Sequence, residues 1–177
     1  MMSHRGGGLF LLLALTMGIA CGTGVSFSAS PPPGPIPQTL ADLVRGASLI
    51  IVVEVVDIRP GRVAGPAEDR LQFKDVRVRV EKRLMGDPPA TVVVEQVAMK
   101  GNAFVSEVGP PYKRGERYVL FLSPGEGARY ITAFQGRYLL KARRVRQTQP
   151  GLVADKLEGM SEAKLVQEIE AIVKGQR

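Results

Sequence analysis

The chain opens with a glycine-rich, weakly basic start that is followed by a largely apolar run. Arg5 supplies the positive charge, and the run, residues 9–20, reads Leu-Phe-Leu-Leu-Leu-Ala-Leu-Thr-Met-Gly-Ile-Ala. A basic start, a short apolar segment and small residues after it are typical of a secretory signal peptide. The run is shorter than the roughly 20 residues that a membrane-spanning helix needs. We therefore predict that residues 1–20 are a signal peptide and that the mature protein is extracytoplasmic; an uncleaved anchor or a core helix is the alternative.

The only cysteine of the chain, Cys21, comes directly after this run. The segment Gly18-Ile19-Ala20-Cys21 resembles the lipobox of bacterial lipoproteins, in which the cysteine receives lipid and becomes the first residue. It departs from that pattern at Gly18, where leucine is usual. The resemblance implies a membrane tether through acyl chains on Cys21. Ordinary cleavage at Ala20 or near Ser28, giving a freely secreted protein, stays open as the alternative.

A segment rich in proline, glycine and serine, residues 21–37, follows the signal. Its last part, Pro-Pro-Pro-Gly-Pro-Ile-Pro, is typical of a stiff polyproline II spacer, although SH3 domains bind such segments too. Removing 20 of the 177 residues leaves 177 − 20 = 157, a length that suits one domain. We predict a β-barrel domain over residues 38–150 and a helical segment over residues 151–177.

Behind the linker, apolar residues recur in short runs with the two-residue period of β-strands. The first run, residues 48–58, is almost continuously apolar, which predicts a strand covered on both faces and ending at Arg59-Pro60-Gly61. The second, residues 71–84, changes its apolar phase, which predicts a bulge near Lys74-Asp75. Four further predicted strands are residues 91–97, 117–122, 130–134 and 137–142. Gln135-Gly136 predicts a tight hairpin between the last two, and Tyr138, Leu140 and Ala142 are expected to face inward.

Two amphipathic helices flank the predicted strands. Thr39 can cap a short helix that carries Leu40, Leu43 and Val44 on one face. Ser161 can cap a longer helix whose apolar residues recur at helical spacing, namely Leu165, Ile169, Ile172 and Val173. The predicted fold is mainly β: a small OB-like β-barrel of about six strands with a short N-terminal helix and a C-terminal amphipathic helix.

Three segments of the chain resemble the OB-type barrel of the netrin/TIMP-like domains. They are residues 41–44 before the first strand, residues 76–82 (Val-Arg-Val-Arg-Val-Glu-Lys) and residues 112–122 (Tyr-Lys-Arg-Gly-Glu-Arg-Tyr-Val-Leu-Phe-Leu). Members of that group carry disulfides, and its protease inhibitors chelate the target's metal through an N-terminal cysteine amine. Here Cys21 is the only cysteine and lies far upstream. The resemblance therefore implies the fold but not the inhibitory mechanism.

The composition excludes several kinds of active site. The single histidine, His4, and Cys21 both lie at the N-terminal end, and the chain has no tryptophan. A histidine general base, a cysteine–histidine pair, a His/Cys zinc site and a structural disulfide cannot be built from the remaining residues. We expect no cofactor, no metal site and no catalytic residue.

The other catalytic patterns are weak. Glu54 interrupts the first strand and could act in a hydrolase built from carboxylates alone, which we keep as a minor alternative. Glu68, Asp69 and Asp75 could offer oxygen ligands to Ca²⁺, but they lack the spacing of a known calcium loop and read better as solvated acids. The Ser-x-x-Lys pattern that begins at Ser161 is better explained by helix capping.

Basic residues form the one pattern that suggests binding. The net charge is +7, and removing the signal with Arg5 leaves +7 − 1 = +6. Residues 137–146 hold five basic residues and no acidic one, and a row on the second strand points outward. The candidate anion-binding residues are Arg137, Lys141, Arg143, Arg144, Arg146, Arg77, Arg79 and Arg83. Such a face could bind an anionic envelope polymer or acidic headgroups, or it could merely protect an edge strand from pairing.

Taken together, these patterns predict an exported, non-enzymatic module that binds a protein or a polymer of the cell envelope. Its only membrane contact would be the lipid on Cys21. An anionic-polymer-binding module that uses the basic residues is the first alternative. OB barrels also bind single-stranded nucleic acid, but we do not expect that ligand for an exported protein.

Overall fold

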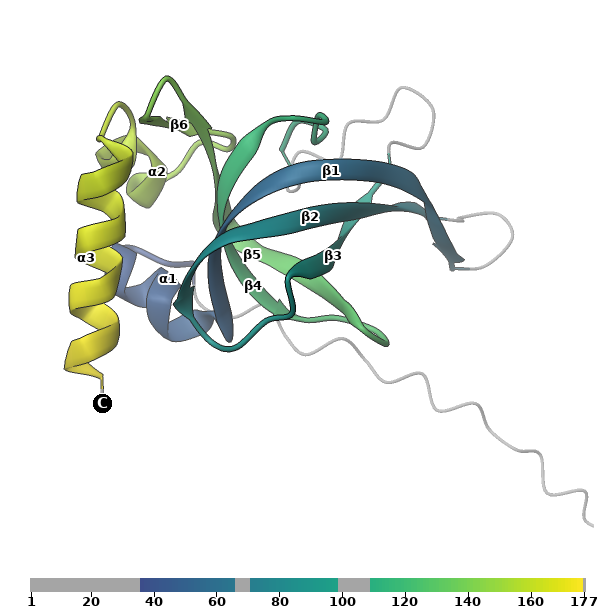
Figure 1. Cartoon of the computed structure of the whole chain (residues 1–177), viewed down its shortest axis with the longest axis horizontal. Helices are drawn as coiled ribbons and strands as arrows, with labels where there is room; N and C mark the ends of the chain where they lie inside the picture. The colour runs from purple at the N-terminus through teal and green to yellow at the C-terminus, as the bar shows by residue number, and fades with distance from the viewer. Residues whose placement is uncertain (1–35, 66–70, 99–108, 177) are drawn as a thin grey trace, which may run out of the picture. The chain divides into compact units, whose positions relative to one another are not determined.

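The computed structural model describes residues 36–65, 71–98 and 109–176, which belong to one compact unit, Pro35–Arg177 (Figure 1). The predicted signal peptide, Cys21 and nearly all of the linker lie outside the described residues. The elements, in chain order, are α1 (Leu40–Gly46), β1 (Leu49–Ala64), β2 (Leu71–Met85), β3 (Thr91–Val97), β4 (Arg117–Pro124), β5 (Arg129–Lys141), β6 (Arg144–Gln147), α2 (Leu152–Leu157) and α3 (Glu162–Gly175).

The strands close into a five-stranded barrel with β6 added at its side. The sheet order is β3-β2-β1-β4-β5-β6, and a further pairing joins β3 to β5. That pairing is parallel, with Val94 opposite Tyr130, whereas the other strand pairs are antiparallel. Closure removes the sheet edges that β3 and β5 would otherwise expose. The predicted OB-like barrel with its two flanking helices is confirmed.

The core is split into two layers by the strands. Alternate residues of β1 and β4 point to opposite sides, because the side-chain period of a strand is two. Ile51, Val53 and Leu120 belong to a barrel-interior cluster, and Ile50 and Phe121 belong to a helix-side cluster between the barrel and the helices. Both faces of β1 are therefore buried at its N-terminal end, as its continuous apolar run predicts.

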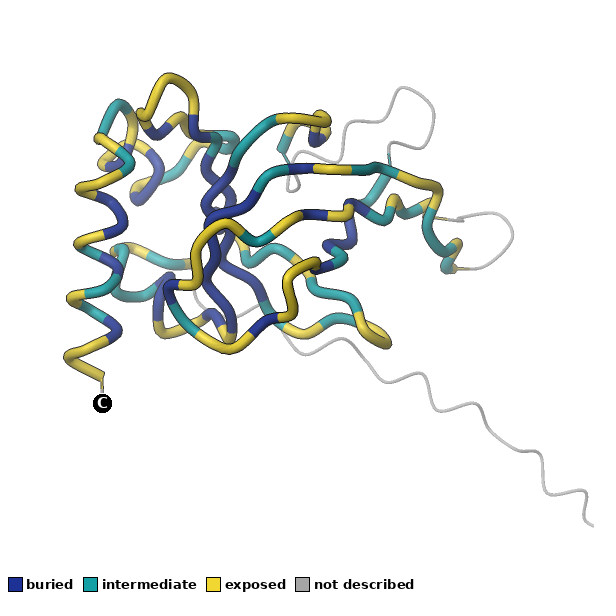
Figure 2. The backbone as a smooth tube through the Cα atoms, in the orientation of Figure 1, coloured by how far each residue is buried: buried dark blue, intermediate teal, exposed yellow. Residues whose placement is uncertain are grey.

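The helices cover one side of the barrel (Figures 1 and 2). In α1, Thr39 and Asp42 form a reciprocal capping box. At the start of α3, the Ser161 hydroxyl accepts a hydrogen bond from the backbone N–H of Lys164 (3.3 Å), which supports capping as the role of the Ser-x-x-Lys pattern. The buried face of α3 carries Leu165, Val166, Ile169 and Val173. Among the described residues, no helix is long and apolar enough to cross a membrane.

Three local predictions are wrong. Gln135-Gly136 is not a hairpin but an irregularity inside β5, where Gln135 has a φ of 57°. The tight turn lies instead at Ala142-Arg143, with φ values of 50° and 59°, so the last strand is β6 and Ala142, which was expected to face inward, is exposed. The first strand was predicted to end at residues 59–61, but β1 continues through them. A bulge was predicted near Lys74-Asp75 of β2, but the extra residues near that point lie in β1. Residues 73–79 of β2 pair with β3 without a shift in register.

The C-terminal part of the unit supplies a test of pH-dependent stability. Glu158 accepts hydrogen bonds from the backbone N–H of Gln147 and from Arg146, both at 2.7 Å. The Gln147 hydrogen bond, followed by that of Arg146, lowers the pKa of this carboxyl. A lowered folded-state pKa gives stability above the unfolded-state pKa that is lost as pH falls.

We therefore expect Glu158→Gln to lower Tm at pH 7, and this deficit should shrink between about pH 5 and pH 3. Thermal unfolding across that range measures it. Glu168→Gln is the control, because Glu168 has only a loose contact with Lys164 at 3.9 Å. A deficit of equal size at pH 3 and pH 7 would contradict this account.

Candidate binding site

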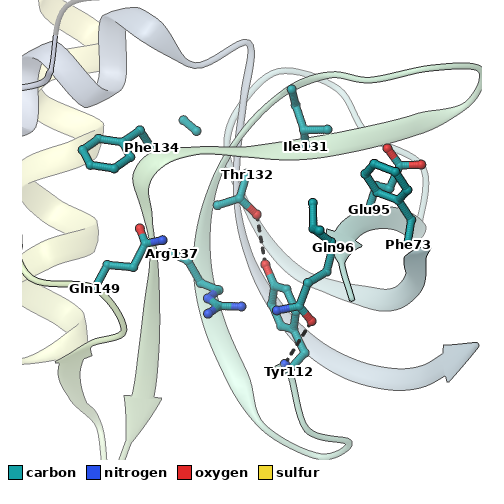
Figure 3. Close-up of a pocket in the computed structure, with 11 residues that line it drawn as sticks. Phe73, Glu95, Gln96, Tyr112, Ile131, Thr132, Phe134, Arg137 and Gln149 are labelled. Atoms are coloured by element: carbon teal, nitrogen blue, oxygen red, sulfur yellow. Dashed lines mark hydrogen bonds between the residues drawn. The ribbon is translucent and has the colours of Figure 1, made fainter. Parts of the chain in front are cut away.

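A cavity of about 250 Å³ lies between the C-terminal end of β3 and the middle of β5, beside the segment that leads into β4 (Figure 3). Its polar lining side chains come from four separate stretches of the chain, which the fold brings together. The lining residues are Phe73, Glu95, Gln96, Val97, Tyr112, Ile131, Thr132, Ala133, Phe134, Arg137 and Gln149.

Arg137 is the most unusual of these residues. Only 4% of its surface is exposed, although its side chain is charged. It lies opposite Leu120, a residue of the barrel-interior cluster, whereas its neighbour Tyr138 lies opposite Val119 on the helix side. Both faces of β5 are covered at this point, so the two adjacent side chains are both buried. The structure therefore places Arg137 in the barrel interior instead of on an exposed basic face, and Tyr138 packs on the helix side.

The Arg137 guanidinium is fixed by backbone, hydroxyl and aromatic contacts. Its Nη2 donates to the carbonyl of Pro110 (2.5 Å) and its Nε donates to the Thr148 hydroxyl (3.3 Å). Its central carbon lies 4.4 Å from the ring centroid of Tyr112 and 6.0 Å from that of Tyr118, within the range of cation–π attraction. These contacts orient the cation but supply no negative charge.

Gly109 allows the chain to pass close to this arginine. It has a φ of +67°, and a Cβ there would lie 2.6 Å from Arg137 Nη2 and 2.9 Å from the carbonyl oxygen of Thr148. A side chain at Gly109 would therefore push Arg137 away from its partners. Gly109 thus has a structural role beside the cavity.

Tyr112 and Gln96 complete the polar wall. Tyr112 is 4% exposed, and its hydroxyl shares a hydrogen bond of 3.0 Å with Thr132. Gln96 donates to the carbonyl of Pro110 (3.3 Å) and accepts from the backbone N–H of Tyr112 (3.4 Å). Burial raises the pKa of the Tyr112 hydroxyl, and the Arg137 charge opposes that rise. The tyrosine therefore stays neutral at physiological pH and does not compensate the arginine.

The carboxylates nearest the cavity have other partners. Glu95 accepts two hydrogen bonds from Arg62, at 2.7 and 3.0 Å, and Glu116 accepts one from Tyr118. Within residues 36–65, 71–98 and 109–176, no carboxylate forms an ion pair with Arg137. A buried cation without a counter-ion is costly, because its desolvation is repaid only when a partner is present. Arg137 therefore has the properties of a group that receives an anion.

The other predicted basic residues do not form one continuous surface. Arg79 pairs with Glu54, Arg83 with Asp87, and Arg146 with Glu158. Arg144 donates to the carbonyl of Gly159 (2.9 Å). The remaining three residues are exposed, and they are Arg77, Lys141 and Arg143.

The two basic groups are also separated in the sheet. Strands β1 and β4 lie between β2 and β5 on one side of the closed barrel, and β3 lies between them on the other. The Arg117 side chain, on β4, bridges Glu81 and Glu162 at 2.9 Å each, which raises the pKa of the arginine. Acidic residues are thus interspersed with the basic ones on this outer face, and the row on β2 does not join the basic residues near β6.

The carboxylates considered for catalysis are held in ion pairs. Glu54 is half-buried and binds Arg79, and Asp75 accepts two hydrogen bonds from Arg129, at 2.9 and 3.0 Å. Glu68 and Asp69 lie outside the described residues. In the part of the chain that the structure describes, no group of three or more His, Cys, Asp or Glu side chains could hold a metal ion.

Sequence reasoning identified Arg137 but not its surroundings. One signal was available for Gln96, which shares the inward phase of Val92 and Val94 on a strand and is polar. Tyr112 and Thr132 carried no such signal, since their proximity depends on closure of the barrel. No protein-family model matches the chain, and no curated protein matches it.

Proposed function

We propose that the mature protein is an extracytoplasmic, non-enzymatic binding module, tethered to a membrane through lipid on Cys21, that binds an anionic group in the cavity lined by Arg137. The observation that carries this proposal is a cation that is 4% exposed, lines a cavity and has no carboxylate partner among the described residues. An anion entering the cavity would supply the missing charge.

The chemistry of the lining supports binding over catalysis. A catalytic site needs a group that can exchange a proton or attack a substrate. Glu95 is held by Arg62, Tyr112 has a raised pKa, and the Thr132 hydroxyl is engaged by Tyr112. The lining can therefore orient and neutralise a ligand, but it offers no evident general base.

Net charge and tethering fit this role. A positive module attracts anions to its surface over a distance of about 10 Å at 0.1 M ionic strength. Residues 21–37 would give the domain reach from the membrane into the envelope. The partners that we propose are an envelope protein or polymer that displays an anionic group; we do not expect nucleic acid, because the sequence predicts export.

Thermal stability in the presence of simple anions tests the site. The mature chain with Cys21→Ser would be unfolded with and without sulfate, phosphate or acetate at constant ionic strength. A ligand at tenfold above its Kd should stabilise the wild-type domain by about 1.4 kcal/mol. We expect this gain to disappear in Arg137→Met and Arg137→Lys, and to persist in the matched surface variant Lys141→Ser/Arg143→Ser.

Comparing the Arg137 variants with the surface variant distinguishes binding in the cavity from binding to the exposed basic residues. Arg137→Lys keeps the positive charge and is the more conservative of the two Arg137 variants. Far-UV circular dichroism would check that both variants are folded. Loss of the gain in the surface variant alone would assign binding to the exposed basic residues and contradict the proposed site. No gain with any anion would contradict anion binding altogether.

The tether is tested separately by intact mass. Expression in a bacterium with lipoprotein processing should give a membrane-bound product whose mass shows acylation at Cys21, and Cys21→Ala should abolish the acylation. A soluble product that begins elsewhere, without added mass, would contradict the tether and leave the cavity proposal standing.

A further inference from the structure

The ligand class can be narrowed from the shape and polarity of the cavity, on the basis of the proposed anion-binding function. We infer that the cavity receives a single carboxylate carried on an apolar body, with the carboxylate against Arg137 and the apolar part against Ile131 and Phe134. Size, donor geometry, charge and the exposed rim each support this inference.

Size limits what can enter. The cavity holds about 250 Å³, just below the roughly 300–1,000 Å³ of sites that enclose drug-sized ligands. It can therefore take the end of a molecule or a small acid, while the remainder of a larger ligand stays outside. This favours a terminal group over an internal segment of a polymer.

The hydrogen-bond donors of Arg137 that the described contacts do not use favour a planar acceptor. A guanidinium carries five N–H donors in one plane. The described contacts engage Nε with Thr148, Nη2 with Pro110 and a further donor with the Tyr112 hydroxyl, which leaves two of the five donors for a ligand. The ring of Tyr112 covers a face of the guanidinium at 4.4 Å, so a ligand must approach in the plane. A carboxylate fits the edge formed by Nη1 and Nη2 with two parallel hydrogen bonds.

Charge favours a monoanion. Arg137 brings one positive charge, and Glu95 lines the same cavity from the side of Phe73 (Figure 3). The Arg62 guanidinium is already committed to Glu95 and to Glu126, at 2.7 and 2.9 Å. A dianionic phosphate would meet one available cation and a nearby carboxylate, and it would demand more donors than this wall offers.

The rim of the cavity is apolar and exposed. Phe134 is 46% exposed and Ile131 is 44% exposed, although both are large apolar side chains. Val97, Ala133 and Phe73 also line the cavity. Exposed apolar side chains next to a polar anchor are typical of a ligand site. An apolar body attached to the carboxylate would cover this rim.

Isothermal titration of the mature chain with Cys21→Ser tests the inference with matched probes. Hexanoate should bind at least about tenfold more tightly than its neutral counterpart hexanamide, because only the acid satisfies Arg137. Hexanoate should also bind more tightly than acetate, because only hexanoate covers the rim. Phe134→Ser should reduce hexanoate affinity severalfold and leave acetate affinity unchanged, while Val56→Ser, at a site 40% exposed on β1, should change neither.

Two further probes identify the source of the carboxylate. The peptide Ala-Ala-Ala-Leu is tested with a free and with an amidated C-terminus. If only the free form binds, the result supports the inference and indicates that the carboxylate comes from the end of a peptide chain. Binding of hexanoate without the peptide would support it and point to a small acid. Equal binding of acetate and hexanoate would overturn the apolar requirement and leave anion binding intact. Equal binding of hexanoate and hexanamide, or no binding of any anion, would overturn both.

Discussion

Replacing Phe121 with alanine should lower the free energy of unfolding by about 3–5 kcal/mol. Phe121 lies on β4 and is fully buried in the helix-side cluster, where its ring meets Tyr138 edge to face, with centroids 6.0 Å apart. It lies opposite Ile50 of β1, which is also fully buried. The surrounding strands are paired on both sides and cannot collapse into the space, so the substitution adds a cavity to the loss of apolar contact.

Urea denaturation of the mature chain measures this loss. Phe134→Ala is the matched control, because that ring is 46% exposed and its removal should cost under about 1 kcal/mol. Comparable losses in the two variants would show that Phe121 is not packed between the barrel and the helices.

Removing α3 should abolish cooperative unfolding. A chain ending at Met160 loses four buried side chains, Leu165, Val166, Ile169 and Val173. Each contributes about 1.5–3 kcal/mol when buried, about 6–12 kcal/mol in total, which rivals the roughly 5–15 kcal/mol that holds a typical domain folded. The truncation also removes part of the helix-side cluster to which Val44, Ile50 and Phe121 belong.

Thermal scanning and size-exclusion chromatography test this expectation. The truncated chain should aggregate or unfold without a sharp transition, whereas Gln167→Ala, an exposed position on the same helix, should leave the transition within a few degrees of wild type. A truncated chain that is monomeric and melts sharply would show that the barrel is stable without its helical cover.

The sequence was most informative where burial is continuous. Residues 49–53 are apolar without interruption, and the structure buries both faces of this N-terminal part of β1. Caps were equally clear, because Thr39 and Ser161 act through neighbours three residues away. These features depend on local pattern, which is what a sequence displays.

The strand ends were less predictable because they depend on the neighbouring strand. Pro60 was expected to end the first strand, but β1 pairs only with β2 at that point, opposite Lys74. No described strand pairs with its other edge there, and an edge strand tolerates a residue without an N–H. Gln135-Gly136 looked like a hairpin, yet β5 only bends there: its pairing with β4 is interrupted between Thr132 and Arg137 and is present on both sides. A bulge serves that bend.

The candidate site could be predicted only in part. Arg137 stood out by charge, but its burial follows from the cover on both faces of β5, which the sequence does not display. Arg79 looked like part of an open basic row because its partner Glu54 lies on another strand. The pairing of strands that are distant in sequence thus determines which basic residues lie next to an acidic partner. It also determines that Arg137 lies in the barrel interior.

The most direct test of the central claim follows Arg137 itself by NMR. In the mature chain with ¹⁵N-labelled arginine, the Nε–H signal of Arg137 can be assigned by its loss in Arg137→Lys. On titration with hexanoate it should shift and saturate, while the signals of the exposed Arg77 and Arg143 stay in place. An unchanged Arg137 signal at hexanoate concentrations that move the exposed arginines would contradict the account and assign anion binding to the surface.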